Sequence, residues 1–173
     1  MILNAIQSGE GPPVTFLHGL FGAARNFGYL QRALSPRFRV IALDMRNHGA
    51  SPHGADMRYT TMAADVLETL GSLNALPSAV IGHSMGGKTA MVAALRQPEA
   101  VGRVLISDIA PVAYQHGNTD IAKALQALPL SSSLTRAQAD AALADTVQDA
   151  SVRAFLLQNL RFGAHPSWRI GLD

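Results

Sequence analysis

The sequence predicts an α/β fold, in which a mostly parallel sheet carries helices on both of its faces. Three observations support this prediction. Short apolar runs alternate with longer helical runs over residues 1–110. Each apolar run ends in a loop that is rich in glycine or polar residues. The connections are long enough to hold the helical crossovers that join parallel strands.

The predicted elements follow an extended start at residues 1–13, which ends in a turn rich in glycine and proline. The sequence predicts four strands, at residues 14–18, 38–43, 79–82 and 104–107. Three helical runs lie between them, at residues 27–34, 61–73 and 88–96. Pro36 and Pro98 end the first and the third of these helices.

The pattern changes after residue 110. Residues 111–173 contain three helical runs and no clear strand, and the second run begins at Thr135 with a capping box. We therefore expect two parts, an α/β core at residues 1–110 and a helical cap or lid segment at residues 111–173.

Composition excludes several classes of protein. The chain has 173 residues, of which 48% are hydrophobic, which is enough to form a core. Its net charge is +2 and its basic residues are scattered, so we expect no nucleic-acid or membrane partner. The absence of cysteine excludes a disulfide, a cysteine nucleophile and a zinc–thiolate site. No signal peptide or membrane-spanning run is visible, so we expect a cytoplasmic protein.

Four loops rich in glycine or polar residues follow the predicted strands, at residues 18–22, 44–52, 82–87 and 108–111. The carboxyl ends of parallel strands meet at one edge of a sheet, where such folds bind their ligands. We therefore expect the four loops to converge on one site.

The loop at residues 82–87 contains the pattern Gly-x-Ser-x-Gly, from Gly82 through Ser84 to Gly86. This pattern is typical of the nucleophile elbow of serine hydrolases, a strained strand-to-helix turn that exposes the serine. Both glycines are expected because a Cβ at either position would clash with neighbouring backbone. The pattern also fits a glycine-rich turn with an incidental serine, but the apolar run before it and the helical run after it favour the elbow.

The four loops together resemble the motifs of a known family: HGLFG at residues 18–22, DMRNHGASP at 44–52, GHSMGGK at 82–88 and DIAPV at 108–112. With them, the sequence resembles the α/β-hydrolase superfamily, and within it the small bacterial esterases of the YbfF type and their mitochondrial relatives. The resemblance extends along the whole chain, and the chain corresponds to the N-terminal two thirds of such an esterase.

Acyl transfer by serine requires a nucleophile, a base, an acid that orients the base, and donors for the oxyanion. Ser84 is the expected nucleophile, and the backbone N–H groups of Met85 and Leu20 are the expected oxyanion donors, with Phe21 as the alternative to Leu20. The resemblance implies that Asp108 is the triad acid, although an aspartate that only caps a turn is the alternative. The expected supporting residues are His18, Gly19, Gly82, His83 and Gly86.

The catalytic base has no clear candidate. In the family it is a histidine on a loop after the last strand, and this chain ends after residues 168–170, where the family continues with two more strands and that histidine. We expect His18 and His48 to brace their loops and His83 to diverge from Ser84. His53, His116 and His165 are expected to be surface residues. The alternative is that His116 or His165, both in the cap segment, reaches Ser84.

The resemblance therefore implies a C-terminally truncated chain that lacks the final strands and the catalytic histidine. The strand at residues 104–107 would then be an exposed apolar edge, which favours self-association. Asp44 and Arg46 could bind substrate or support the neighbouring loop, and the resemblance favours support.

The leading hypothesis is a serine carboxylic-ester hydrolase that acts on short to medium acyl esters or thioesters through an acyl-Ser84 intermediate, without metal or cofactor. A carbon–carbon bond hydrolase and a perhydrolase use the same triad and remain alternatives. Because the histidine is missing, a catalytically inactive fragment or a binding module on a hydrolase scaffold is the alternative from another class.

Overall fold

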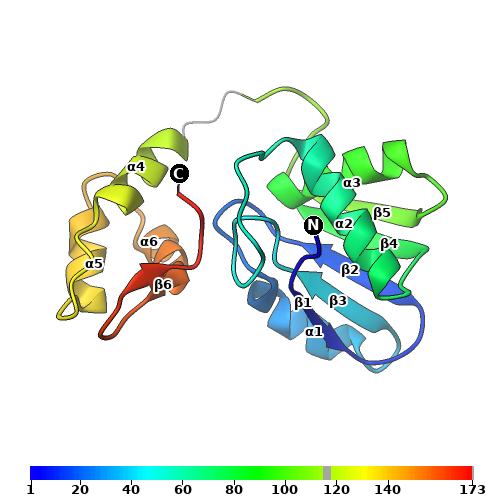
Figure 1. Cartoon of the computed structure of the whole chain (residues 1–173), viewed down its shortest axis with the longest axis horizontal. Coiled ribbons are helices and arrows are strands. Elements are labelled where there is room, and N and C mark those ends of the chain that lie inside the picture. Colours follow the sequence, from blue (N-terminus) through cyan, green and yellow to red (C-terminus); the bar gives the residue numbers. More distant parts are fainter. Residues whose placement is uncertain (115–117, 173) are drawn as a thin grey trace. The chain divides into compact units, whose positions relative to one another are not determined.

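A computed structural model describes residues 1–114 and 118–172 (Figure 1). The chain forms two compact units, residues 1–111 and residues 112–173, and each is described by itself. His116 lies outside the described residues.

The first unit contains a five-stranded sheet with the strand order β1-β3-β2-β4-β5. Its strands are β1 (Ala5–Ser8), β2 (Pro13–Leu17), β3 (Arg39–Leu43), β4 (Ser78–His83) and β5 (Val101–Ser107). The pairs β2–β3, β2–β4 and β4–β5 are parallel, and β1 pairs antiparallel with β3. The predicted mostly parallel sheet is confirmed.

Two strands differ from the prediction by more than one residue at either end. β1 forms within the segment expected only to be extended, because its backbone pairs with β3 from Ala5 opposite Leu43 to Ser8 opposite Val40. β5 begins three residues before the predicted start. Gly102 and Arg103 interrupt the apolar pattern, but Val101 and Arg103 still pair with β4, with a register shift at Gly102.

Helices cover both faces of the sheet, as predicted. The helices of this unit are η1 (Ala24–Phe27), α1 (Gly28–Leu34), α2 (Tyr59–Ser72) and α3 (Met85–Arg96). Alternate residues of β2 point to opposite faces: Leu17 belongs to the core under α2 and α3, and Phe16 belongs to the cluster under η1 and α1. Figure 1 shows α2 and α3 on one side of the strands and α1 on the other.

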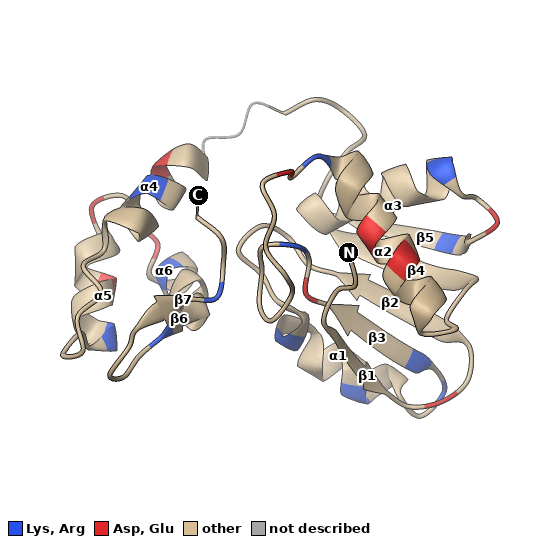
Figure 2. Ribbon diagram, viewed as in Figure 1, with Lys and Arg blue, Asp and Glu red and all other residues tan. Residues whose placement is uncertain are grey.

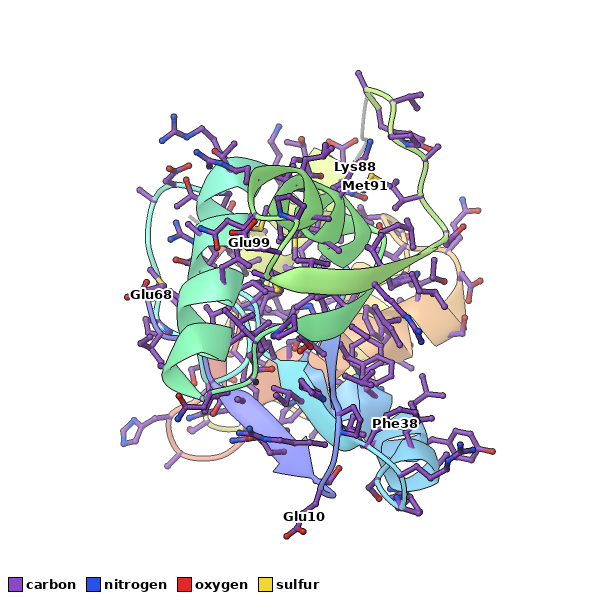
Figure 3. The ribbon with its side chains drawn as sticks, turned by 90° about the vertical axis from the view of Figure 1, so that its right-hand side faces the viewer. Glu10, Phe38, Glu68, Lys88, Met91 and Glu99 are labelled. Carbon is purple, nitrogen blue, oxygen red and sulfur yellow. The ribbon has the colours of Figure 1, made fainter. Side chains whose placement is uncertain are left out.

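Within this unit, helices cover the α1 face of the sheet only in part. Along β4 the residues on the α2–α3 face are buried, whereas Ala79, Ile81 and His83 are more exposed. An apolar hollow of about 390 Å³ lies there, lined by Phe16, Phe27, Leu30, Leu34, Ile81, His83, Leu105 and Ser107. Figure 3 looks onto the β5 edge of the sheet, with β5 in front, below α3 and its labelled Lys88 and Met91.

The second unit contains α4 (Asn118–Ala127), α5 (Arg136–Leu143), α6 (Ala150–Leu156) and η2 (Leu157–Asn159). The predicted capping box is confirmed: the Gln138 N–H donates to Thr135 Oγ1 at 3.2 Å, and the Thr135 N–H donates to Gln138 Oε1 at 2.9 Å. The unit also holds a short hairpin, β6 (Leu160–Arg161) and β7 (Ser167–Trp168), where the sequence showed no clear strand. Two-residue strands are too short to give an alternating pattern.

Charged residues are spread over the described elements of both units (Figure 2). In the described part of the chain, no helix is long and apolar enough to span a membrane.

Candidate active site

Ser84 lies in the turn between the end of β4 and the start of α3. Its backbone has φ 49° and ψ −115°, a strained conformation for a residue with a side chain. Two backbone bonds hold it: the Ser84 N–H donates to Ser107 O of β5, and the Lys88 N–H donates to Ser84 O, both at 3.1 Å. The first turn of α3 therefore begins directly after a fixed, strained serine.

The two glycines of the pattern are required by close backbone approach. A Cβ on Gly82 would lie 2.7 Å from Gly87 Cα and closer still to the Gly86 carbonyl oxygen. A Cβ on Gly86 would lie 2.7 Å from the His18 carbonyl oxygen and closer still to that of Leu17. The structure thus confirms the predicted reason for glycine at both positions.

The loop after β2 lies against this turn. A Cβ on Gly19 would lie 3.3 Å from Ser84 Cβ and 2.9 Å from His83 Nδ1. Residues 19–22 form a tight turn, in which the Gly22 N–H donates to Gly19 O at 2.9 Å and Phe21 adopts a left-handed φ of 61°.

The backbone N–H groups of this loop differ in whether they have a hydrogen-bond partner. Those of residues 21–24 each have a partner: His48 Nε2, Gly19 O, Asn26 Oδ1 and Asp44 Oδ1, in that order. Within the described residues, the Leu20 N–H has none. Met85 is the first residue of α3, so its N–H has no carbonyl partner within the helix. Two N–H groups, one in the loop that lies against the serine turn and one directly after Ser84 in the chain, are therefore available to an acceptor.

Two buried histidines brace the loops that follow β2 and β3. The Met45 N–H donates to His18 Nε2 at 2.9 Å, so the proton is on His18 Nδ1, which donates to Gly19 O at 2.8 Å. His48 has the same tautomer: its Nε2 accepts the Phe21 N–H at 3.2 Å and its Nδ1–H donates to Arg46 O at 2.8 Å.

Burial keeps both imidazoles neutral. It is the main cause that lowers the pKa of His18 to about 3, and the neighbouring His48 adds to the effect. Burial also lowers the pKa of His48, against the opposing effects of its bond to Arg46 O and of nearby Asp44. Both rings are braces of the site, as predicted, and neither has a lone pair free to accept a proton from Ser84.

Asp44 and Arg46 are buried within the loop network. Asp44 accepts the N–H groups of Ala24 at 2.7 Å and Ala50 at 2.9 Å. Arg46 pairs with Asp65 of α2 through an Nε–Oδ2 distance of 2.6 Å and also donates to Asp56 O. These contacts give both residues the predicted supporting position.

Asp108 directly follows β5 and has a left-handed φ of 57°. Its Oδ2 lies 3.7 Å from Nε2 of His83, which is longer than a hydrogen bond. Both side chains are open to solvent, with 49% of His83 and 86% of Asp108 exposed. The structure thus brings the predicted acid beside the residue that precedes Ser84.

No histidine among the described residues hydrogen-bonds Ser84 Oγ. His18 and His48 are engaged in the loops, and His53 is exposed. His165 belongs to the second unit. The described residues also contain no group of three or more metal-ligating side chains.

Two features of the site were not found from the sequence. One is the bond from the Phe21 N–H to His48, which joins residues 27 positions apart. The other is the apolar hollow, whose lining includes His83 and Ser107, both of which adjoin the serine turn. The apolar spacing in β4 and β5 is the only sequence signal for it, and that spacing does not show which face stays uncovered.

Comparison with known proteins places this geometry in a family. The model of the alpha/beta hydrolase fold matches residues 12–169. The chain is 42% identical over 171 residues to the mouse (Mus musculus) sn-1-specific diacylglycerol lipase ABHD11, covering 94% of this chain and 56% of that protein. It is 36% identical over 161 residues to esterase YbfF of Escherichia coli, covering 92% of this chain and 62% of that protein.

A solved marine microorganism esterase superposes on 99% of this chain with a TM-score of 0.94 and 35% identity, and 69% of that esterase is covered. The chain spans little more than half the length of the mouse lipase and about two thirds of the solved esterase. The strained serine turn, the adjoining glycine loop and these matches lead to one conclusion: the chain belongs to the α/β-hydrolase family.

Proposed function

We propose that this chain carries the nucleophile half of a serine carboxylic-ester hydrolase, which acts on short to medium acyl esters or thioesters through an acyl-Ser84 intermediate. The observation that carries the proposal is the position of Ser84. It stands on a strained turn, directly before the Met85 N–H and against the loop that holds the Leu20 N–H, and these two groups have no partner in their own elements.

In this reaction the Ser84 oxygen attacks the ester carbonyl carbon and its proton is transferred to a base. The carbonyl oxygen becomes negative and accepts the Leu20 and Met85 N–H groups. The alcohol then leaves, and water releases the acid from Ser84. The Phe21 N–H is already bound to His48, which supports Leu20 over Phe21 as the second donor.

We assign the role of triad acid to Asp108. Its place directly after β5, next to the serine strand β4, and its approach to His83 support this role. The remaining supporting residues are His18 and Gly19 in the adjoining loop and Gly82, His83 and Gly86 in the turn.

The base is the part of the triad that the first unit does not supply among its described residues. A hydrolase that lacks a triad member keeps only about 10³–10⁴-fold acceleration over water, from the oxyanion donors and from substrate binding. Slow turnover is therefore expected of this chain. The esterase and lipase names of the relatives support an ester as the substrate class.

Hydrolysis of p-nitrophenyl butyrate tests this proposal. The purified chain should release p-nitrophenol faster than the Ser84→Ala variant, which keeps only the acceleration that the oxyanion donors and substrate binding supply. Equal rates for the two proteins would reject Ser84 as the nucleophile. They would favour the second candidate, an inactive hydrolase scaffold that binds without reacting. That candidate is also supported because no histidine of the described residues hydrogen-bonds Ser84 Oγ.

We also propose that two copies of this chain associate through β5. Among the described residues this strand pairs only with β4, so its other edge has no partner strand there, and Val104 and Leu105 are 46% and 54% exposed. Long, apolar, unpaired edge strands favour pairing with another chain.

A further inference from the structure

We propose that His48 is a positioning residue of the Ser84 reaction: its imidazole binds the Phe21 N–H and so fixes the turn that presents the Leu20 N–H to the substrate oxygen. The inference rests on the proposed function of Ser84, and it assigns a role to a residue of the loop after β3, outside the serine turn.

The contacts of His48 make it a rigid acceptor. The ring is buried, and its Nδ1–H donates to Arg46 O at 2.8 Å, which leaves the lone pair of Nε2 directed at the Phe21 N–H, 3.2 Å away. The backbone of His48 is held as well, because its N–H donates to Met45 O at 3.0 Å and its carbonyl accepts the Ser51 N–H at 3.1 Å. An anchored ring can impose its position on the loop that it contacts.

The turn at residues 19–22 needs such a constraint. Phe21 has a left-handed φ of 61°, which is uncommon for a bulky side chain and persists only where the surroundings enforce it. The Gly22 N–H and the His18 ring both bind Gly19 O, so the start of the turn is held by His18. His48 holds its centre. Without that bond, Phe21 can return to a negative φ, which turns the Leu20–Phe21 peptide plane and releases Leu20 from its position.

The same bond selects the oxyanion donor. The N–H groups of residues 21–24 are all bound, and Leu20 is the one residue of the turn segment 20–24 whose N–H has no partner among the described residues. The loop lies against Ser84, since a Cβ on Gly19 would be 3.3 Å from Ser84 Cβ. By binding Phe21, His48 leaves a single donor in this loop for the developing negative charge.

The charge state of His48 fits this role. Burial lowers its pKa, and nearby His53 acts in the same direction, while the bond to Arg46 O and the charge of Asp44 oppose them. His18, whose ring centroid lies 5.0 Å away, is neutral as well. The Nε2 lone pair is therefore retained at neutral pH.

Two substitutions of His48 test the Nε2 acceptor separately from the Nδ1–H donor. In His48→Asn the amide can still donate to Arg46 O, but nothing reaches Phe21; in His48→Gln the longer side chain offers an oxygen near the position of Nε2. Loss of one oxyanion donor costs on the order of 10²–10³ in kcat. We expect His48→Asn to lower kcat for p-nitrophenyl butyrate about 10-fold to 100-fold with KM within about twofold, and His48→Gln to recover part of the loss.

His53 provides the matched control, because it is an exposed histidine directly after the same loop. The His53→Asn variant should keep the wild-type kcat. A His48→Asn variant that folds and keeps its kcat, or that loses activity only through KM, would overturn the proposal.

Amide exchange and nitrogen NMR test the same contact without turnover, so a failure of the proposed function can be told apart from a failure of this inference. In the wild-type chain the Phe21 N–H should be protected from exchange, the Leu20 N–H should not be, and His48 should carry its proton on Nδ1. Protection of Phe21 should be lost in His48→Asn and kept in His53→Asn. A His48 proton on Nε2, or an unprotected Phe21 N–H in the wild-type chain, would reject the inference even if His48→Asn does not fold.

Discussion

At the scale of single residues, the site depends on buried imidazoles that must stay neutral. His18 uses one nitrogen as a donor to Gly19 O and the other as an acceptor from the Met45 N–H. A proton added to Nε2 would replace that acceptor with a donor that faces another N–H group. The pKa of His18 is low, about 3, mainly because the added proton would place a positive charge in a buried site.

This gives a prediction for the pH dependence of stability. The unfolded chain takes up the His18 proton near the ordinary histidine pKa of about 6.5, whereas the folded chain does so only near 3. The unfolded state therefore binds more protons between these values, so the stabilisation is complete above pH 6.5 and is lost as the pH falls towards 3. His18 alone should reduce the free energy of unfolding by about 1 kcal/mol per pH unit below pH 6.

Urea unfolding at pH 6 and pH 5 measures this slope. The exposed His53 should contribute little, so His53→Asn should keep the wild-type slope while His18→Asn should flatten it. A slope in His18→Asn as steep as in the wild-type chain would show that His18 is not the group responsible.

At the scale of elements, the site is built where β4, its turn and α3 meet the end of β2. Gly86 lets the first turn of α3 pass against the carbonyl groups of Leu17 and His18, and this contact places Ser84 beside the loop at residues 19–22. The same contact brings the loop that holds the Leu20 N–H against the turn that holds the Met85 N–H, the two groups of the proposed oxyanion site.

We therefore expect Gly86→Ala to be costly. Its Cβ would meet fixed backbone, and overpacking of this kind costs roughly 1–3 kcal/mol or more. Gly102→Ala in β5 is the matched control, because the nearest atom to a Cβ there, Pro77 Cβ, is 3.9 Å away. Thermal unfolding followed by circular dichroism should show a clear loss of Tm for the first variant only. Equal Tm values for both would contradict the close approach.

Sequence patterns could predict some of these features and not others. The serine turn was predictable because its glycines, strand and helix lie within a few consecutive residues. β1 was not, since its four residues become a strand only by pairing with β3, more than thirty residues away in the chain. The His48–Phe21 bond was hidden for the same reason. The hairpin β6–β7 is too short to leave a pattern.

At the scale of the whole molecule, the two edges of the sheet differ. β1 forms one edge and has only four residues, whereas β5 forms the other and has seven. Short edges resist pairing with other chains and long apolar ones favour it. Two copies joined through antiparallel β5 strands would form a symmetric, closed dimer.

Light scattering over a range of concentrations tests this association. We expect the mass of the wild-type chain to rise with concentration, and Val104→Lys to suppress the rise because a lysine on the edge opposes strand pairing. Leu95→Lys on α3 is the control, since Leu95 is 84% exposed but does not belong to the edge. A wild-type chain that stays monomeric at all concentrations would contradict the proposed pairing.

The central claim of this account is that Ser84 is a nucleophile held by a hydrolase turn. Intact-protein mass spectrometry after incubation with p-nitrophenyl butyrate and an acid quench tests it most directly. We expect a single butyryl adduct, located by peptide mapping at Ser84 and missing from the Ser84→Ala variant. The adduct should be hydrolysed slowly, because no histidine of the described residues hydrogen-bonds Ser84 Oγ. A chain without an adduct at Ser84, or one with the same adducts in Ser84→Ala, would contradict the claim.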